Sequence, residues 1–170
     1  LAARVADRTD GRLAVLVIAP FLNLIDQWRR EASRFGLDLL PCAVDRKHWF
    51  DRLRSSVTSY NSGTRRVLGI ATTGNTLRSA LLQEQLARIR GPLLVIADEM
   101  HNYGTEAAIE SLPTSAKLRL GLSATWQRWR DDDGTDTLEL PREQGAGKLT
   151  GLLRSSPPGC AASVVAVPVP

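Results

Sequence analysis

Four short apolar runs, separated by segments with helical spacing, constrain the fold of this chain more than any other feature. The runs are Leu13–Ala19, Val67–Ala71, Leu93–Ala97 and Leu118–Leu122. Each has the length and composition of a strand that is buried on both faces of a parallel sheet. A weaker fifth strand is expected within Leu37–Val44.

Apolar residues recur with helical spacing between these runs, which predicts a helix after each strand. The expected helices are Leu24–Phe35, Trp49–Tyr60, Ser79–Arg90 and Thr105–Leu112. Alternating strands and helices of about 10 to 15 residues indicate βαβ units. The predicted fold class is therefore α/β, with a parallel sheet that binds ligands at the carboxyl ends of its strands.

The composition is that of one globular domain. The chain has 170 residues, of which 43% are hydrophobic and 24% charged, which excludes a disordered or fibrous protein. The formal net charge of +4 permits a polyanionic partner without requiring one, because acidic and basic residues are interleaved. Only three of the 22 basic residues are lysines, so most cations are guanidinium groups suited to bidentate phosphate contacts.

Cysteine spacing and hydropathy indicate where such a chain resides. Cys42 and Cys160 are far apart, which indicates neither a zinc site nor a disulfide framework. The apolar stretch Leu13–Leu22 is interrupted by Pro20 and is shorter than the roughly 20 residues that a membrane span needs. These features predict a cytoplasmic protein without a membrane partner.

Two adjacent carboxylates, Asp98 and Glu99, follow the third apolar run, and His101 comes shortly after them. Such a pair at a strand end suits magnesium-nucleotide chemistry, in which one acid holds the ion and the other reaches a water molecule. The same pair could instead stabilise the start of a helix through the helix macrodipole. His101 could equally be a turn or core residue, so the residues alone leave both readings open.

The end of the fourth run, Ser123-Ala124-Thr125, places hydroxyl groups where they can interact with the neighbouring strand end. With this triplet the chain resembles superfamily 2 helicases. The segment 97–101 resembles motif II, the DEAH-type Walker B box, and the triplet resembles motif III. Two further stretches match in the expected order: 19–28 resembles motif Ia with its helix, and 71–77 resembles motif Ic.

The resemblance extends from Leu1 to about Thr137 and is greatest to the branch with UvrB/XPB-like proteins and restriction-enzyme motor subunits. It implies that the intact parent uses ATP and Mg²⁺. Asp98 would hold the magnesium ion through water, and Glu99 would activate the attacking water. His101 would couple nucleotide state to nucleic acid. The coupling partners that the resemblance implies for it are Ser123, Ala124 and Thr125.

Motifs Ia and Ic contact the phosphodiester backbone in this family. The resemblance therefore implies nucleic-acid contacts, with DNA as the expected partner. The residues so implied are Gln27, Arg29, Thr72, Thr73 and Asn75. Contacts to the backbone grip a strand without reading its sequence.

Two departures from the family pattern concern the motifs themselves. Trp126 stands where the family has proline after the motif III triplet. A phosphate-binding loop G-x-x-x-x-G-K-[ST] is also absent: Gly147-Lys148 is preceded by Arg142 at the first glycine position and followed by Leu149. The expectation is thus an incomplete RecA-like P-loop NTPase lobe over 1–138, with the phosphate-loop strand missing and Leu118–Leu122 left as an unpaired edge.

The segment 139–170 carries scattered proline and glycine, so it is expected to be an irregular, disordered or non-native tail. The predicted function is a fragment of an ATP-dependent DNA helicase or translocase. By itself it is expected to be inactive, because its partners would be a phosphate-loop segment and a second RecA-like lobe. The alternative is a non-catalytic remnant or nucleic-acid-binding module.

Overall fold

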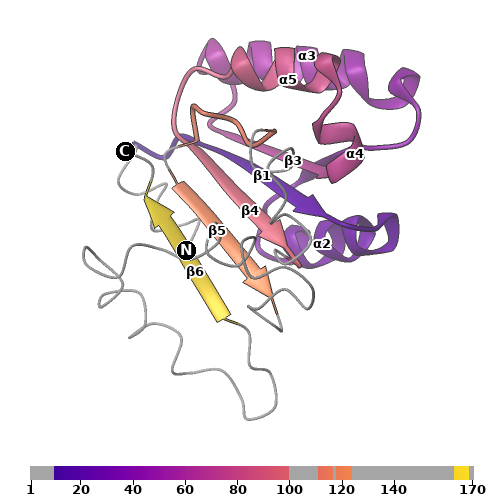
Figure 1. Ribbon diagram of the computed structural model, residues 1–170. Coiled ribbons are helices and arrows are strands. Elements are labelled where there is room, and N and C mark those ends of the chain that lie inside the picture. The colour runs from indigo at the N-terminus through magenta and orange to yellow at the C-terminus, as the bar shows by residue number, and fades with distance from the viewer. Residues whose placement is uncertain (1–9, 100–110, 117, 124–162, 169–170) are drawn as a thin grey trace.

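A six-stranded sheet forms the centre of the computed structural model (Figure 1). The structure describes residues 10–99, 111–116, 118–123 and 163–168, with only the backbone for Ser123 and for 163–168. Five strands are parallel, and β6 runs antiparallel beside β5. The spatial order is β2-β3-β1-β4-β5-β6. The strands are β1 (Leu13–Ala19), β2 (Leu39–Cys42), β3 (Val67–Thr73), β4 (Leu93–Asp98), β5 (Leu118–Ser123) and β6 (Ser163–Pro168).

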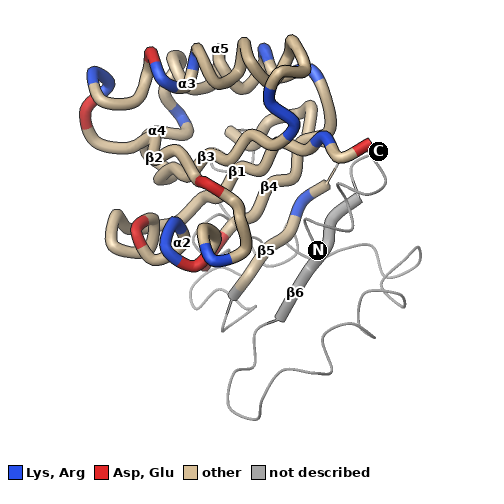
Figure 2. The backbone as a smooth tube through the Cα atoms, turned by 180° about the vertical axis from the view of Figure 1, so that it is seen from behind, with Lys and Arg blue, Asp and Glu red and all other residues tan. Residues whose placement is uncertain are grey.

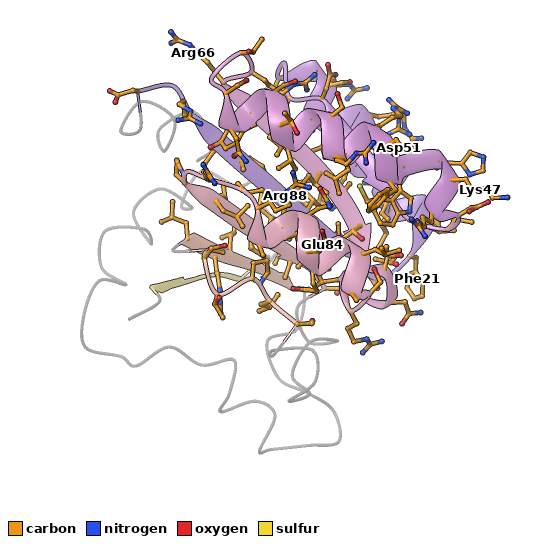
Figure 3. All side chains as sticks on the ribbon, turned by 90° about the horizontal axis from the view of Figure 1, so that it is seen from above. Phe21, Lys47, Asp51, Arg66, Glu84 and Arg88 are labelled. Carbon is orange, nitrogen blue, oxygen red and sulfur yellow. The ribbon has the colours of Figure 1, made fainter. Side chains whose placement is uncertain are left out.

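Helices cover both faces of this sheet. They are α2 (Leu22–Arg34), α3 (Arg46–Asn61), α4 (Gly74–Leu77) and α5 (Ala80–Ala87). Figure 3 shows α3 and α5 lying across one face, and α2 lies on the other. The central strand β1 therefore contributes to two cores: Leu16 and Ile18 pack with α3 and α5, whereas Val15 and Val17 pack with α2. The predicted α/β class with a parallel sheet is confirmed.

The observed strands extend further than the apolar runs that predicted them. Strand β3 continues through Thr72 and Thr73, and β4 continues through Asp98. The reason is pairing: β1 keeps β3 in register to its last residue, where Ala19 lies opposite Thr73. The polar ends are therefore part of the sheet, although hydropathy alone ended the strands before them.

The helices differ in their bounds from those predicted: α2 begins two residues before Leu24, and α3 begins three residues before Trp49. The helix predicted over Ser79–Arg90 is observed as the shorter α5. It begins at Ala80, because the Ser79 side chain caps it by accepting a hydrogen bond from the Leu82 N–H, and it ends at Ala87. The helix predicted over 105–112 lies largely outside the described residues. Across the described parts of the chain, no helix is both long and apolar enough to cross a bilayer.

The expectation that β5 would be an unpaired edge is wrong. Strand β6 pairs with it from Leu118 opposite Pro168 to Ser123 opposite Ser163. The sequence of β6 is Ser-Val-Val-Ala-Val-Pro, and valine favours extended backbone. Proline and glycine surround this short valine run in the sequence, and 163–168 forms a strand within the segment expected to be irregular. The remainder of 139–170 lies outside the described residues.

Strands β2 and β3 approach each other closely at Gly69. This residue is in register with Leu39, and a Cβ atom added to it would lie 2.3 Å from the backbone oxygen of Asp38. A backbone atom cannot yield as a flexible side chain would. Glycine at this position is therefore a packing requirement.

We predict that Gly69→Ala lowers the free energy of unfolding by about 1 to 3 kcal/mol, because β2 must shift to admit the methyl group. Urea unfolding of the purified chain measures this change. Asn23→Ala, on the exposed side of α2, serves as the control and should stay within about 0.5 kcal/mol. Equal stability of the two variants would contradict the close approach.

We also predict that the thiol of Cys42 is unreactive in the folded chain. Burial raises its pKa to about 12, with a smaller opposing effect from the positive charge of Arg52. At pH 8 only about one thiol in 10⁴ would then be ionised, and the thiolate is the reactive form. A Cys160→Ser variant isolates Cys42 for labelling with a disulfide reagent. Labelling should be slow until urea unfolds the chain, and rapid labelling of the native state would show the burial to be wrong.

Candidate active-site edge

The carboxyl ends of four parallel strands meet at one side of the sheet, which we call the carboxyl edge. Pairing places Ile18 of β1 level with both Thr72 of β3 and Ala97 of β4. Asp98 in turn lies level with Leu122 of β5. The predicted site residues at the ends of β3, β4 and β5 are thereby brought to the same edge, as the α/β fold predicts.

Two hydrogen bonds position Asp98 at this edge. Its Oδ2 atom accepts a hydrogen bond of 2.7 Å from the Trp28 Nε1–H group of α2. Its Oδ1 atom accepts one of 3.0 Å from the backbone N–H of Glu99. Both carboxylate oxygens are thus oriented while the side chain remains half-buried.

Glu99 lies where the chain turns away from the sheet. Its φ angle is +53°, in the left-handed region that residues with a side chain rarely adopt. Such a conformation costs roughly 1 to 3 kcal/mol and is common at functional sites. The turn leaves the half-buried Glu99 next to Asp98 at the carboxyl edge.

The two carboxylates suit a hydrated magnesium ion better than a closed metal site. A carboxylate has about four lone-pair positions, and the two hydrogen bonds to Asp98 leave others available. Magnesium in nucleotide sites keeps several waters and uses one or two carboxylates together with phosphate oxygens. In the described part of the chain, no three His, Cys, Asp or Glu side chains cluster as metal ligands. Asp98 and Glu99 therefore fit an ion that arrives with its nucleotide.

The residues at the end of β3 have different environments. Thr72 is fully buried, and its hydroxyl donates a 2.7 Å hydrogen bond to the Cys42 carbonyl, so it joins β3 to β2. Thr73 is partly exposed and caps α4 by accepting from the Thr76 N–H. Asn75 is exposed, and its Oδ1 accepts a 2.7 Å hydrogen bond from Arg78. Thr73 and Asn75 are thus accessible to a ligand, whereas Thr72 is not.

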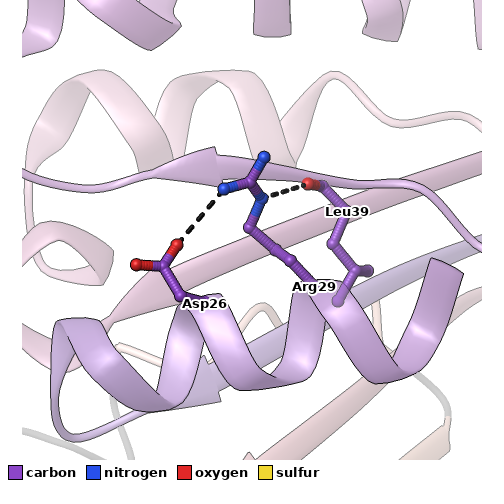
Figure 4. Close-up of polar contacts among 3 residues, drawn as sticks. All are labelled: Asp26, Arg29 and Leu39. Carbon is purple, nitrogen blue, oxygen red and sulfur yellow. Dashed lines mark hydrogen bonds and ion pairs between the residues drawn. The ribbon is translucent and has the colours of Figure 1, made fainter.

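The structure does not bring Arg29 to the carboxyl edge. Its Nε donates to the Leu39 carbonyl at 3.3 Å, and its Nη1 lies 3.2 Å from the Asp26 carboxylate (Figure 4). Leu39 is in register with Gly69, four residues before Thr73, which is about 13 Å along a strand. Gln27, also on α2, is exposed.

Other predicted residues lie outside the described residues: His101, Ala124 and Thr125, together with the side chain of Ser123. Trp28 lies in the segment that resembles motif Ia, but the sequence does not identify it as the partner of Asp98. The signal for such a contact is the indole N–H itself, because a buried tryptophan usually donates this hydrogen to an acceptor.

Comparison with known families agrees with this arrangement. The family model described as "Type III restriction enzyme, res subunit" matches residues 1–128, three quarters of the chain. The chain belongs to this family. Res-subunit family members are helicase-like, ATP-dependent DNA enzymes of the P-loop superfamily, so the restriction-enzyme part of the resemblance is confirmed. The matched region includes Asp98, Glu99 and the segment 123–125.

The chain is similar to a de novo designed protein with a P-loop NTPase fold, solved by solution NMR. The identity is 14%, the TM-score 0.43, and the alignment covers 75% of this chain and 87% of the designed one. No curated protein matches the chain significantly.

We predict a measurable coupling between Trp28 and Asp98. A double-mutant cycle with Trp28→Phe and Asp98→Ala should give about 1 to 3 kcal/mol at pH 7, because the acceptor is charged and partly buried. Urea unfolding of the four proteins measures it. Replacing Trp28→Phe by Trp49→Phe, on the opposite side of the sheet, should give additive effects. Additivity in both cycles would show that the hydrogen bond does not form.

Proposed function

We propose that this chain is part of the ATP-binding RecA-like lobe, over 1–138, of a superfamily 2 DNA helicase or translocase with a DEAH-type motif II. The observation that carries the proposal is the position of Asp98 and Glu99. Asp98 ends the parallel strand β4 and Glu99 follows it. Strand β5 pairs with β4 on one side, and β1 separates β4 from the polar end of β3 on the other, in a chain of a helicase-like family. The competing proposal, a non-catalytic nucleic-acid-binding module, needs no such carboxylate pair.

In this proposal the residues of the carboxyl edge have different roles in ATP hydrolysis. Bound Mg²⁺ neutralises charge on the phosphates of ATP and polarises them. Asp98 holds the ion through water, in the orientation that Trp28 imposes. Glu99 accepts a proton from the attacking water and aligns it, and His101 with Ser123, Ala124 and Thr125 relays the nucleotide state.

Nucleic-acid contacts in this proposal come from the carboxyl edge and from the exposed side of α2. Thr73, Asn75 and Gln27 are the accessible polar residues that motif resemblance assigns to the phosphodiester backbone. DNA is the proposed polymer, because the family to which the chain belongs acts on DNA. A cytoplasmic location is part of the same proposal.

ATP turnover in this proposal needs more than these 170 residues. None of them forms the G-x-x-x-x-G-K-[ST] loop, which supplies amide donors and a lysine to the β- and γ-phosphates. Asp98 and Glu99 without that loop would repel a triphosphate. We therefore propose that a phosphate-loop segment and a second RecA-like lobe complete the enzyme, and that this chain by itself has no ATPase activity.

The test compares Glu99→Gln with wild type in a longer polypeptide that includes a phosphate loop. ATP affinity should change little, and kcat should fall about 10²- to 10⁴-fold, because only the water-aligning base is removed. Glu84→Gln, on the exposed side of α5, is the charge-matched control and should leave kcat unchanged. Wild-type turnover by Glu99→Gln would exclude the proposed role. DNA-stimulated ATPase activity of the 170-residue chain, abolished by Glu99→Gln, would exclude the need for the loop.

A further inference from the structure

A polar groove of about 910 Å³ runs along β2, the outermost strand on the side of the sheet opposite β6. One wall comes from α2 and the other from α3, and these helices cover opposite faces of the sheet. In Figure 2 the strand lies between the two helices. We call this feature the β2 groove. It lies apart from the carboxyl edge and takes no part in the site described above.

Arginine is the most frequent charged residue in the lining of the β2 groove. Its lining includes Arg29, Arg30, Arg52 and Arg65. Three acids also line it, but two of them are paired with arginines: Asp26 with Arg29 at 3.2 Å, and Asp51 with Arg54 at 3.3 Å.

Three of the groove arginines are available to a ligand. Within the described residues, Arg30, Arg52 and Arg65 form no ion pair, and all three are exposed. Asp38 is the remaining acid, so the groove has a surplus of uncompensated positive charge. The hydroxyls of Ser55 and Ser56 line the same wall and add donors of the kind that bind phosphate oxygens.

The edge of β2 is poorly suited to the other common occupant of such a groove, an added peptide strand. Pro41 removes one N–H donor from this four-residue strand. The Leu39 carbonyl already accepts from Arg29 at 3.3 Å. An outermost strand that lacks a free donor and a free acceptor in this way pairs poorly with a strand of another chain. Guanidinium and hydroxyl donors along the walls instead fit a chain of phosphates.

We propose that the β2 groove binds the sugar-phosphate backbone of nucleic acid as a second contact, separate from the carboxyl edge. The inference rests on the proposed function in one respect, the identity of the polymer. Gly69 lines the groove about 13 Å along the strand from Thr73, which corresponds to about four base-pair steps of duplex. A strand held at the edge can therefore continue into the groove, where the exposed arginines bind it without regard to sequence.

The test measures binding of the purified 170-residue chain to fluorescein-labelled single-stranded and duplex DNA by fluorescence anisotropy. The NaCl concentration is varied from about 50 to about 300 mM, a range over which the affinity of phosphate contacts changes strongly. The groove variant is Arg52→Gln with Arg65→Gln. The control is Arg88→Gln with Arg90→Gln, which removes the same charge from exposed residues that neither line the groove nor pair with an acid that does. A third variant, Thr73→Ala with Asn75→Ala, alters the carboxyl edge. Circular dichroism confirms that each variant is folded.

On duplex DNA the groove variant should lose up to about 60-fold in affinity at 0.1 M salt. Its plot of log K against log salt should be shallower by about 1.8 on duplex and by about 1.4 on single strands, because two phosphate contacts are lost. The control should change by less than about threefold and keep the wild-type slope. Identical behaviour of groove and control variants would overturn the proposal.

The edge variant separates this inference from the proposed function. Weaker binding by the edge variant together with wild-type behaviour of the groove variant would overturn only the groove. Weaker binding by the groove variant alone would keep the groove and count against the edge contacts. Absence of binding by the wild-type chain would overturn both. Equally tight binding of labelled polyglutamate, weakened by the same groove substitutions, would overturn nucleic acid as the ligand in favour of an acidic protein segment.

Discussion

The burial of β1 on both faces and its pairing on both sides determine where every other part of the site lies. All seven of its residues are buried, and it pairs in parallel with β3 and with β4. Because Leu16 lies level with both Ile70 and Val95, the two neighbouring strands reach the carboxyl edge together. A one-residue slip of either neighbour would turn its core side chains to the opposite face. The position of Asp98 at that edge therefore follows from apolar packing several residues away.

Local hydropathy predicted the parallel strands well, because each one is a buried apolar run and polar segments separate it from the next run in the sequence. It identified β1 with its observed bounds, and it located β3, β4 and β5 to within two residues. It failed for β6, since only the free edge of β5 makes a short valine run in a proline-rich segment into a strand. Pairing between distant segments is not encoded in either segment alone. The same limit hid the packing of Thr72 against Cys42.

For the candidate site, the sequence indicated which positions lie at strand ends but not which way the helical residues point. Gln27, Trp28 and Arg29 are consecutive on α2, so their side chains project about 100° apart around the helix axis. Only Trp28 can then face Asp98, whereas Arg29 faces β2. A motif match treats these three neighbours as one unit. The geometry of the helix assigns them to different surfaces.

Helix α2 consequently joins the two surfaces on which the proposals rest. Trp28 reaches the carboxylate of Asp98 at 2.7 Å, and the next residue, Arg29, lines the β2 groove while bonded to Leu39 at 3.3 Å. Hydrogen bonds weaken over a few tenths of an ångström, and a short helix moves as one body. A displacement of α2 that improved phosphate contacts in the groove would therefore also strain the hydrogen bond that orients Asp98. Any coupling between nucleic acid in the β2 groove and Asp98, the carboxylate proposed to hold magnesium, would then act through the single turn of α2 that contains Trp28 and Arg29.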